Sequence, residues 1–572
     1  MVGTLNSLVL LIPENFIILF EIGIMIIAAG LLAFIFKLLR QPRIPAYIVA
    51  GIILGPLALG VVSNSEVIRA LSEIGVAFLL FFAGMEINFK GLKQVGKAAT
   101  VVGLSEMFLI TLITAGIVFG LGFNIIEIVY ATLVVAFSST MVVIKLLTDK
   151  HELGTLHGRI IIGVLLVQDI IAILALTILT TNFTLQTIAI SLGKALVFAI
   201  FAFILAKISE PVFKSSAKSS ELLFITSISF LFIFALSAYM FGLSVIIGSF
   251  FAGVALANST FKTEIMGRIH PLSDFFGAIL FVSLGMQLVW IPRELWGLFV
   301  ILILLIMLVK PWIIFLSVRL LGFTNRTSFL TGNSLGQSSE FALIILIAGL
   351  SSAQISSDMF SVLVFVTIIT MSLTSYFVKY ESGLYKLARR PVKAFDFLPT
   401  KKEELNYGLE RKKKIIILGC HRIGTLILKK FINKKDEILV IDHNPSIIKA
   451  LINKKIPSLY GDFGNPEIVE KLGFINPEMI ISTIPDKEDN IQLIKKVREI
   501  NKKTIIIVVG VSIDDALDYY EKGADYVILP KLLSGERISH VIGKVRKNRN
   551  GLKKKEISSL NDLHFFLYKK KK

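Results

Sequence analysis

Long apolar segments separated by short polar ones fill the first 380 residues of the chain, and shorter apolar and amphipathic runs alternate after about residue 412. A helix that crosses a membrane needs roughly 17–25 predominantly apolar residues. By this measure we expect about thirteen spans, near residues 16–36, 44–60, 67–87, 98–121, 126–147, 158–181, 186–206, 222–240, 243–258, 273–290, 296–318, 327–350 and 357–379. The first part of the chain is therefore predicted to be a polytopic α-helical membrane protein.

Basic residues occur in every second loop of this pattern, and the opposite loops hold almost none, Arg293 excepted. The basic loops lie at residues 37–43, 90–97, 145–159, 207–218, 262–268, 319–326 and 379–389. Cytoplasmic loops carry the excess of Lys and Arg in membrane proteins. We therefore predict a multi-pass protein of the cell membrane with its N-terminus outside and its C-terminal part in the cytoplasm, which requires an odd number of spans.

Asp169 lies near the middle of the apolar segment 158–181. An ionisable side chain at that depth is costly, and it usually marks an ion or proton pathway. Other polar residues lie equally deep in their own segments, and Ser and Thr alone would also suit helix packing. Taken together they predict one binding site for a small cation, made by Ser138, Ser139, Thr140, Gln168, Asp169, Lys310, Gln337, Ser338 and Glu340.

Two of these spans, 126–147 and 327–350, run in opposite directions and carry a small polar interruption at their midpoints. This pattern is typical of inverted repeats with two broken crossing helices. A broken helix frees backbone carbonyls, which offset buried positive charge. We expect Asp169 to supply the negative charge for the cation. Lys310 would be the internal counter-charge, paired with Asp169 or with a crossing carbonyl when no cation is bound.

Further acids lie within the apolar spans, and of these Glu21, Glu73 and Glu106 could line a water path. Glu73 and Glu86 lie near the outer and inner ends of one span, where solvated positions are expected. Glu106 is deeper, and its sequence position is as compatible with a structural role as with a functional one.

Short motifs in the membrane domain resemble those of the Kef-type monovalent cation–proton antiporters. They are the stretches 46–56, 82–86, 138–140, 167–170, 250–253 and 283–286, with Lys310 and the stretch 336–341. The resemblance implies a homodimer of thirteen-helix protomers in which Asp169 binds the cation or the proton. It implies no enzyme activity.

The residue before Asp169 bears on the choice of cation. Gln168 precedes it here, similar to the Kef-type potassium exchangers, whereas electrogenic sodium exchangers typically have two adjacent acids at this position. The resemblance therefore favours potassium, and sodium–proton exchange remains the alternative. The stretch 263–270 contains Arg268 and has little net acidity, which argues against the glutathione gating of some Kef proteins.

The C-terminal part has the pattern of an α/β Rossmann-like domain. An apolar strand at 415–418 leads into the loop Gly419, Cys420, His421, Arg422, Ile423 and Gly424. A second strand at 437–441 ends in Asp442, at about the usual distance for a carboxylate that binds an adenosine ribose. Further strands are expected at 457–460, 479–483, 504–510 and 525–529.

This domain is similar to the RCK or KTN nucleotide-binding modules of potassium channels and transporters, a match that includes Gly461, Asp462 and the stretch 523–527. It predicts a regulatory adenine nucleotide: AMP, ATP or NAD(H). His421 stands where the fingerprint has its second glycine and would reshape the diphosphate site, so the identity of the nucleotide stays open. An empty Rossmann-like cleft is the alternative.

Composition agrees with this division of the chain. Hydrophobic residues make up 54% of the chain, and the mean hydropathy is +0.77. We predict a transmembrane domain at 1–380, a basic linker at 381–411, a nucleotide-binding domain at 412–543 and a basic tail at 544–572. The net charge of +19 is concentrated on the predicted inner face, the linker and the tail. Membrane lipid with anionic headgroups explains it better than nucleic acid, for which no reading motif is present.

Two other functions fit the sequence less well. A potassium channel gated by an RCK domain would need a carbonyl selectivity filter of the TVGYG kind, which the sequence lacks. A membrane-bound oxidoreductase would leave Asp169 and Lys310 unexplained.

Overall fold

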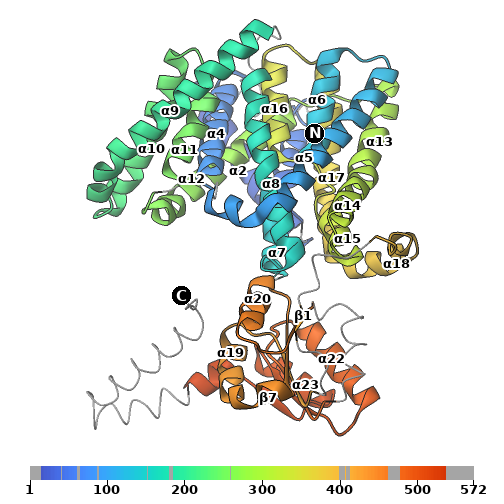
Figure 1. The fold of residues 1–572 in the computed structure, drawn as a ribbon. Coiled ribbons are helices and arrows are strands. Elements are labelled where there is room, and N and C mark those ends of the chain that lie inside the picture. The colour runs from blue at the N-terminus through green and yellow to red at the C-terminus, as the bar shows by residue number, and fades with distance from the viewer. Residues whose placement is uncertain are drawn as a thin grey trace. The chain divides into compact units, whose positions relative to one another are not determined.

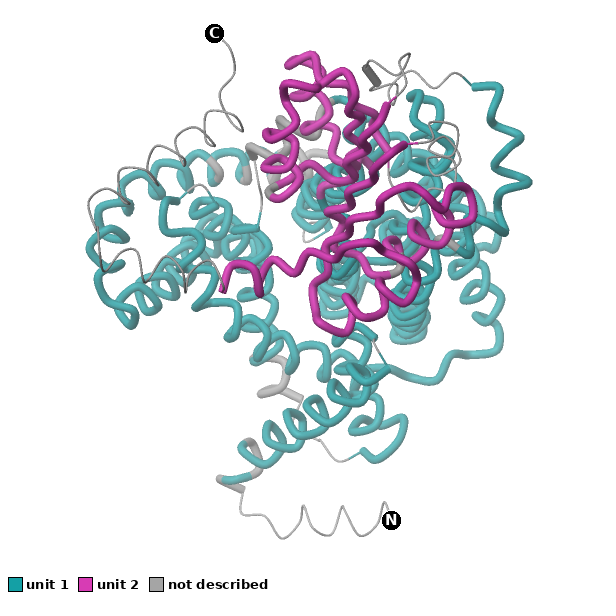
Figure 2. Tube along the Cα trace, turned by 90° about the horizontal axis from the view of Figure 1, so that it is seen from below, with its two compact units in different colours: residues 1–153, 157–399 teal, residues 154–156, 400–572 magenta. Residues whose placement is uncertain are grey.

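The computed structural model describes residues 14–39, 41–60, 65–86, 89–150, 152–179, 185–257, 259–398, 406–407, 413–461 and 477–535. The chain divides into two compact units, coloured separately in Figure 2. Unit 1 comprises residues 1–153 and 157–399, and unit 2 comprises residues 154–156 and 400–572. The basic tail expected at 544–572 lies outside the described residues.

The described residues of unit 1 form helices joined by short connections (Figure 1). They are α2 (Glu14–Leu38), α3 (Arg43–Leu54), α4 (Ser65–Glu86), α5 (Phe89–Gly120), α6 (Ile125–Ala136), α7 (Thr140–Asp149), α8 (Leu156–Leu179), α9 (Leu185–Ser216), α10 (Ser220–Met240), α11 (Val245–Leu256), α12 (Lys262–Met286), α13 (Trp296–Leu304), α14 (Lys310–Leu320), α15 (Asn325–Ser334), α16 (Glu340–Ser351), α17 (Ser357–Lys379) and α18 (Glu381–Lys393).

Nine helical segments among the described residues are long and apolar enough to cross a membrane. Three more apolar helices, α3, α11 and α16, have only 12 residues each, about 18 Å at 1.5 Å per residue. All the expected spans coincide with a helix or with a pair of consecutive helices. The polytopic helical fold is therefore confirmed, and the number thirteen is not.

Glycines set the closest helix contacts in unit 1. A Cβ at Gly285 of α12 would lie 2.1 Å from the carbonyl oxygen of Ile48 in α3. A Cβ at Gly253 of α11 would lie 2.1 Å from the carbonyl oxygen of Phe81 in α4. Because backbone atoms cannot move aside as a side chain can, both positions require glycine. Two of the motifs that resemble the Kef family are therefore helix-packing contacts.

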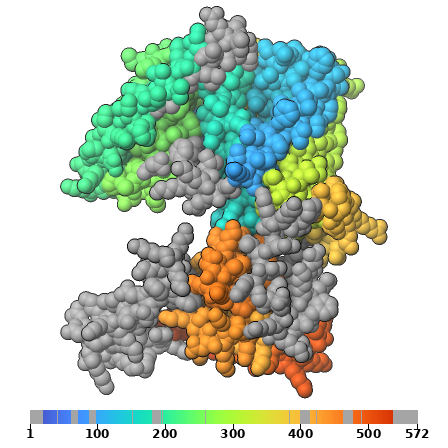
Figure 3. All heavy atoms as spheres, in the orientation of Figure 1, coloured from blue at the N-terminus to red at the C-terminus, as the bar shows by residue number. Residues whose placement is uncertain are grey.

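Helices α9 and α10 form one flank of unit 1, seen in green and teal in Figures 1 and 3. Large apolar side chains on these helices are exposed, among them Leu196, Phe203, Ile208, Leu236 and Tyr239. Exposed apolar surface of this extent is expected where helices face lipid or another protein.

Among the residues of unit 2 that the structure describes, seven strands form one sheet with the order β1-β4-β3-β2-β5-β6-β7. The strands are β1 (Asn406–Tyr407), β2 (Ile415–Leu418), β3 (Ile438–Asp442), β4 (Ser458–Tyr460), β5 (Met479–Ser482), β6 (Ile505–Val509) and β7 (Tyr526–Ile528). All neighbouring strands are parallel except β1, which pairs with β4 in the antiparallel sense. The doubly wound sheet is thus confirmed, and β1 is an edge strand that the sequence pattern did not predict.

Helices cover the sheet on both faces: α19 (Arg422–Lys430), α20 (Pro445–Asn453), α22 (Lys487–Ile500) and α23 (Ile513–Glu521). In β2, Ile416 and Leu418 join the apolar cluster on one face, and Ile417 joins the cluster on the other. A strand buried on both faces reads as a continuous apolar run, which is why 415–418 could be identified from the sequence.

The first half of the expected linker belongs to unit 1. Residues 381–393 form α18, and the turn that follows is held by α14 and α15. Arg319 donates hydrogen bonds to the carbonyls of Phe395 and Leu398. Asn325 donates to the carbonyl of Val392. This stretch was predicted to be part of a linker because its composition is polar. Composition does not reveal the tertiary contacts that hold it against unit 1.

Candidate functional site

Two helix breaks bring the predicted polar residues together. Residues Phe137–Ser139 separate α6 from α7, and residues Leu335–Ser339 separate α15 from α16. The helices that follow are capped in the same way. The Ser139 hydroxyl accepts from the backbone N–H of Val142, and the Ser339 hydroxyl accepts from that of Phe341. Both serines are N-caps, which accounts for the second of the two hydroxyl residues in each interruption.

The two breaks contact one another directly. The Ser138 hydroxyl donates to the carbonyl of Leu335 at 3.0 Å. Reciprocally, the Ser338 hydroxyl donates to the carbonyl of Val134 at 2.7 Å. The side chain of Gln337 donates to the carbonyl of Ser139 at 3.3 Å. The broken helices therefore cross, as the opposed interruptions predicted.

Lys310 occupies the centre of this crossing. It begins α14 directly after a π-helical turn at Leu305–Val309, and it is completely buried. Its Nζ donates to the carbonyls of Phe137 and Gln337, both at 3.0 Å. Phe137 is the C-cap of α6, so its carbonyl belongs to the negative end of that helix dipole. Of the two partners expected for Lys310, the described residues show the crossing carbonyls and no ion pair with Asp169.

Gln168 and Asp169 are consecutive residues of α8, and their side chains lie in two different environments. Gln168 is buried, and its carbonyl oxygen accepts from the backbone N–H of Ser138 at 3.1 Å. Asp169 is only partly buried, and its two carboxylate oxygens accept from the Thr140 hydroxyl at 3.1 and 3.0 Å. Consecutive residues on a helix point about 100° apart. Gln168 therefore stabilises the crossing, and Asp169 remains available at its edge.

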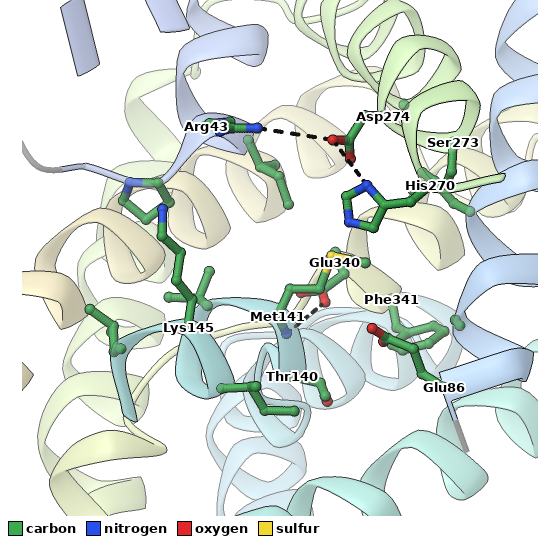
Figure 4. A pocket seen from close by; sticks show the side chains of 18 of the residues that line it. Arg43, Glu86, Thr140, Met141, Lys145, His270, Ser273, Asp274, Glu340 and Phe341 are labelled. Atoms are coloured by element: carbon green, nitrogen blue, oxygen red, sulfur yellow. Dashed lines mark hydrogen bonds and ion pairs between the residues drawn. The ribbon is translucent and has the colours of Figure 1, made fainter. Parts of the chain in front are cut away.

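A cavity of about 1160 Å³ reaches Asp169 from the surface of unit 1. Thr140, Glu340 and Glu86 also line it (Figure 4). Glu340 accepts from the backbone N–H of Met141 at 3.4 Å, and its second oxygen makes no hydrogen bond among the described residues. A water molecule takes about 30 Å³ of liquid volume, so the cavity has room for water and a small cation beside Asp169.

Charged side chains surround another part of the cavity. Arg43 lies 3.9 Å from Asp274, whose carboxylate also lies 3.4 Å from the Nδ1 of His270 (Figure 4). All three line the cavity, and Asp274 is about half exposed. An exposed pair of this kind contributes little to stability.

Two acids near the site were not assigned from the sequence. Glu86 lines the cavity, although its position near the end of a span predicted simple solvation. Glu106 of α5 is completely buried and accepts a hydrogen bond from the Gln168 amide at 2.8 Å. Its other oxygen lies 4.0 Å from Lys310 Nζ. The depth of Glu106 in its apolar span was the sequence feature that could have identified it, because a buried acid in such a span requires a partner.

The predicted nucleotide loop lies at the carboxyl end of β2, in the centre of the sheet of unit 2. Gly419 has a positive φ of 80°, and a Cβ at Gly424 would lie 2.0 Å from the Gly419 carbonyl oxygen. Both glycines of the fingerprint are thus required by the backbone. His421 has an ordinary φ of −80° and an exposed side chain. A side chain at this position is therefore compatible with the loop.

Asp442 ends β3 beside this loop. Its carboxylate accepts from the backbone N–H groups of Cys420 at 2.6 Å and Asn444 at 2.7 Å. A carboxylate has about four acceptor sites, so capacity remains for ribose hydroxyls. Ile423 is partly buried and Gly461 is buried after β4. The side chain of Arg422 and the whole of Asp462 lie outside what the structure describes.

The fold and these sites define a membrane cation/proton antiporter with a cytoplasmic-type nucleotide-binding domain. Residues 24–379, more than half of the chain, match the family described as sodium/hydrogen exchanger, transmembrane. The chain belongs to this family. Residues 415–530 match the TrkA-N domain family.

Solved structures with related parts were also found. Unit 1 is similar to the sodium proton antiporter MjNhaP1 from Methanocaldococcus jannaschii, at 18% identity over 66% of this chain and 100% of that chain, with a TM-score of 0.49. Unit 2 is similar to the TrkA-N domain of the inner membrane protein ybaL from Escherichia coli, at 19% identity over 23% and 98%, with a TM-score of 0.22. It is also similar to the NAD(P)-binding domain of an exopolyphosphatase-related protein from Archaeoglobus fulgidus, at 19% identity over 23% and 98%, with a TM-score of 0.21.

Cys420, the single cysteine, allows a direct check of the nucleotide loop. Burial raises the pKa of its thiol to about 12. Because the thiolate is the reactive form, we expect a chromogenic disulfide reagent at about pH 8 to react with the native protein on the order of a thousandfold more slowly than with the unfolded chain. Equal rates in the two states would show that the loop is open and the thiol accessible.

Proposed function

We propose that the protein exchanges a monovalent cation, preferentially potassium, for a proton, and that Asp169 carries both in turn. The observation that carries this proposal is the position of Asp169 at the cavity, held by Thr140 and not paired with Lys310. One carboxylate that binds either a cation or a proton makes the two compete. Competition at a site open to one side at a time is sufficient for exchange.

The preference for potassium rests on the neighbour of Asp169. Gln168 takes the place of a second acid and turns into the crossing, where it bonds Ser138 and Glu106. Asp169 with the neutral Thr140 hydroxyl makes a weaker field than two adjacent acids. The number and field strength of ligands are among the factors that select potassium over sodium. Glu340 and Glu86 line the same cavity and strengthen the case for sodium as the competing cation.

We further propose that the basic loops and the nucleotide domain face the cytoplasm of a cell-membrane protein and that the chain acts as a homodimer. The alternation of basic loops supports the orientation. The loop at Gly419 and Asp442 supports binding of AMP, ATP or NAD(H). No catalytic role is proposed for this domain.

Contacts within unit 1 offer a route by which the domain could regulate exchange. Lys150, at the end of α7, donates to the Val378 carbonyl at 2.6 Å and to Glu381 of α18 at 2.5 Å. Arg319, near the end of α14, holds the turn after α18. Helices α7 and α14 begin at Thr140 and Lys310. A displacement of α18 would therefore move α7 and α14, and with them Thr140 and Lys310 of the proposed ion site.

The transport proposal is tested in proteoliposomes that contain a pH-sensitive dye. Addition of potassium should release protons at lower concentration than addition of sodium. Asp169→Asn should reduce both responses to those of empty liposomes, because an amide cannot release a proton. Asp358→Asn, an exposed acid that does not line the cavity, is the matched control and should retain exchange. Wild-type exchange in Asp169→Asn would exclude Asp169 as the carrier.

The regulatory proposal is tested by titrating full-length protein with AMP, ATP and NAD(H). Coupling of about 1–3 kcal/mol would change the exchange rate or apparent affinity by about 5- to 150-fold. Asp442→Ala should weaken nucleotide binding, and Glu381→Gln should leave binding intact but reduce the effect on exchange. The exposed Asp514→Ala is the control. If no nucleotide binds the full-length protein, the domain has a different role.

A further inference from the structure

Helix α18 has one face that packs against unit 1 and a second face that is exposed. On the packed side, the ring of Tyr385 lies 5.4 Å from the ring of Phe329 in α15. Val392 is buried, and its carbonyl accepts a hydrogen bond from Asn325 of α15. These contacts fix which side of α18 is turned away from the other helices.

The exposed face combines a large apolar side chain with basic ones. Leu387 is 81% exposed, and the basic side chains of Lys386, Arg389, Arg390 and Lys393 are exposed beside it. None of these four basic side chains forms an ion pair with another described residue. At 100° per residue, the four lie along one side of the face that has Leu387 near its centre.

This helix begins directly after a membrane-spanning one. α17 is long and apolar enough to cross a membrane, and only Tyr380 separates it from α18. Tyr380 is 58% exposed, and the Nζ of Lys379 lies 5.0 Å from the centre of its ring. Tyrosines are enriched where a span leaves the lipid. Figure 1 shows α18 turned away from the axis of α17, so its exposed face stays near the headgroups.

A single exposed leucine is ordinary on a water-soluble surface. A leucine flanked by four unpaired cations, in a helix that starts at the end of a span, has the composition of a helix that lies in the membrane interface. There the apolar side chain enters the boundary between headgroups and acyl chains. Each Lys or Arg near an anionic surface strengthens binding by about fivefold.

We propose that α18 is an interfacial helix whose exposed face binds the anionic headgroups of the adjacent membrane leaflet. Lys386 and Arg390 bind lipid phosphates, and Leu387 inserts between the acyl chains. Because α18 is also bound to α7 through Glu381 and Lys150, the lipid would stabilise the position of the helix that leads towards the nucleotide domain. The inference does not depend on which cation is exchanged.

The test places an environment-sensitive fluorophore on the exposed face of α18. Ala394→Cys introduces an exposed thiol just after the helix, whereas the native Cys420 is buried and should react slowly. Labelled full-length protein is reconstituted in phosphatidylcholine liposomes with and without phosphatidylglycerol. Lipids that carry a nitroxide on the acyl chain should quench the fluorophore, and quenching should be at least about twofold stronger with phosphatidylglycerol.

Variants separate the charges from the apolar contact. Lys386→Gln/Arg390→Gln should abolish the increase with phosphatidylglycerol. Lys502→Gln/Lys503→Gln removes the same charge from an exposed pair in unit 2, and this matched control should retain the increase. Leu387→Gln should reduce quenching in both kinds of liposome. All these side chains are exposed, so the variants should fold.

Two results would contradict the inference. One is quenching in the wild type that does not increase with phosphatidylglycerol, and the other is an increase that persists in Lys386→Gln/Arg390→Gln. If a second copy of the chain covers the face instead, the fluorophore will be shielded in both kinds of liposome to an extent that depends on the protein-to-lipid ratio, which also overturns the inference. No ion gradient is used, so failure of the proposed exchange would leave this result unchanged.

Discussion

The arrangement of unit 1 depends on holding one positive charge, that of Lys310, in an apolar interior. Its side chain is inaccessible to solvent, so the protein must provide acceptors. It does so by interrupting two helices at the same place, which leaves the carbonyls of Phe137 and Gln337 free to accept at 3.0 Å. The paired serines then cap the helices that restart. Breaks, caps and crossing are thus consequences of the same requirement.

Because Lys310 is satisfied at the crossing, Asp169, the proposed carrier, is not paired with it. Gln168 bonds the backbone of one broken helix and the carboxylate of Glu106, which fixes α8 against the crossing. The next side chain along α8 then points to the cavity, where its Thr140 partner is a neutral hydroxyl. Thr140 begins α7, and the far end of α7 is bound to α18 through Lys150 and Glu381. The proposed ion site is therefore connected, within unit 1, to the segment that leads to the nucleotide domain.

The sequence predicted the type and position of the helices and strands, and the depth of polar residues in the membrane segments, better than it predicted the contacts between elements. The six parallel strands of unit 2 lie within one or two residues of their expected positions, because strands buried on both faces are continuous apolar runs bounded by polar residues. The helix breaks at Ser138 and Ser338 could also be predicted, because each is a short polar stretch inside a long apolar segment. Hydropathy does not show which side of a helix faces which neighbour. The partnership of Glu106 with Lys310, the packing of α18 and the edge strand β1 are tertiary contacts between distant segments, and no local pattern predicts them.

The central claim is that a cation and a proton compete for Asp169, and proton release on cation binding tests it most directly. Purified full-length protein in a weakly buffered solution is titrated with potassium or sodium chloride while the pH is followed. Because a carboxylate must be deprotonated to bind a cation, the account predicts release of about one proton per chain at a pH where Asp169 is protonated, and none from Asp169→Asn. Saturable cation binding without proton release, or equal release by the variant, would contradict it.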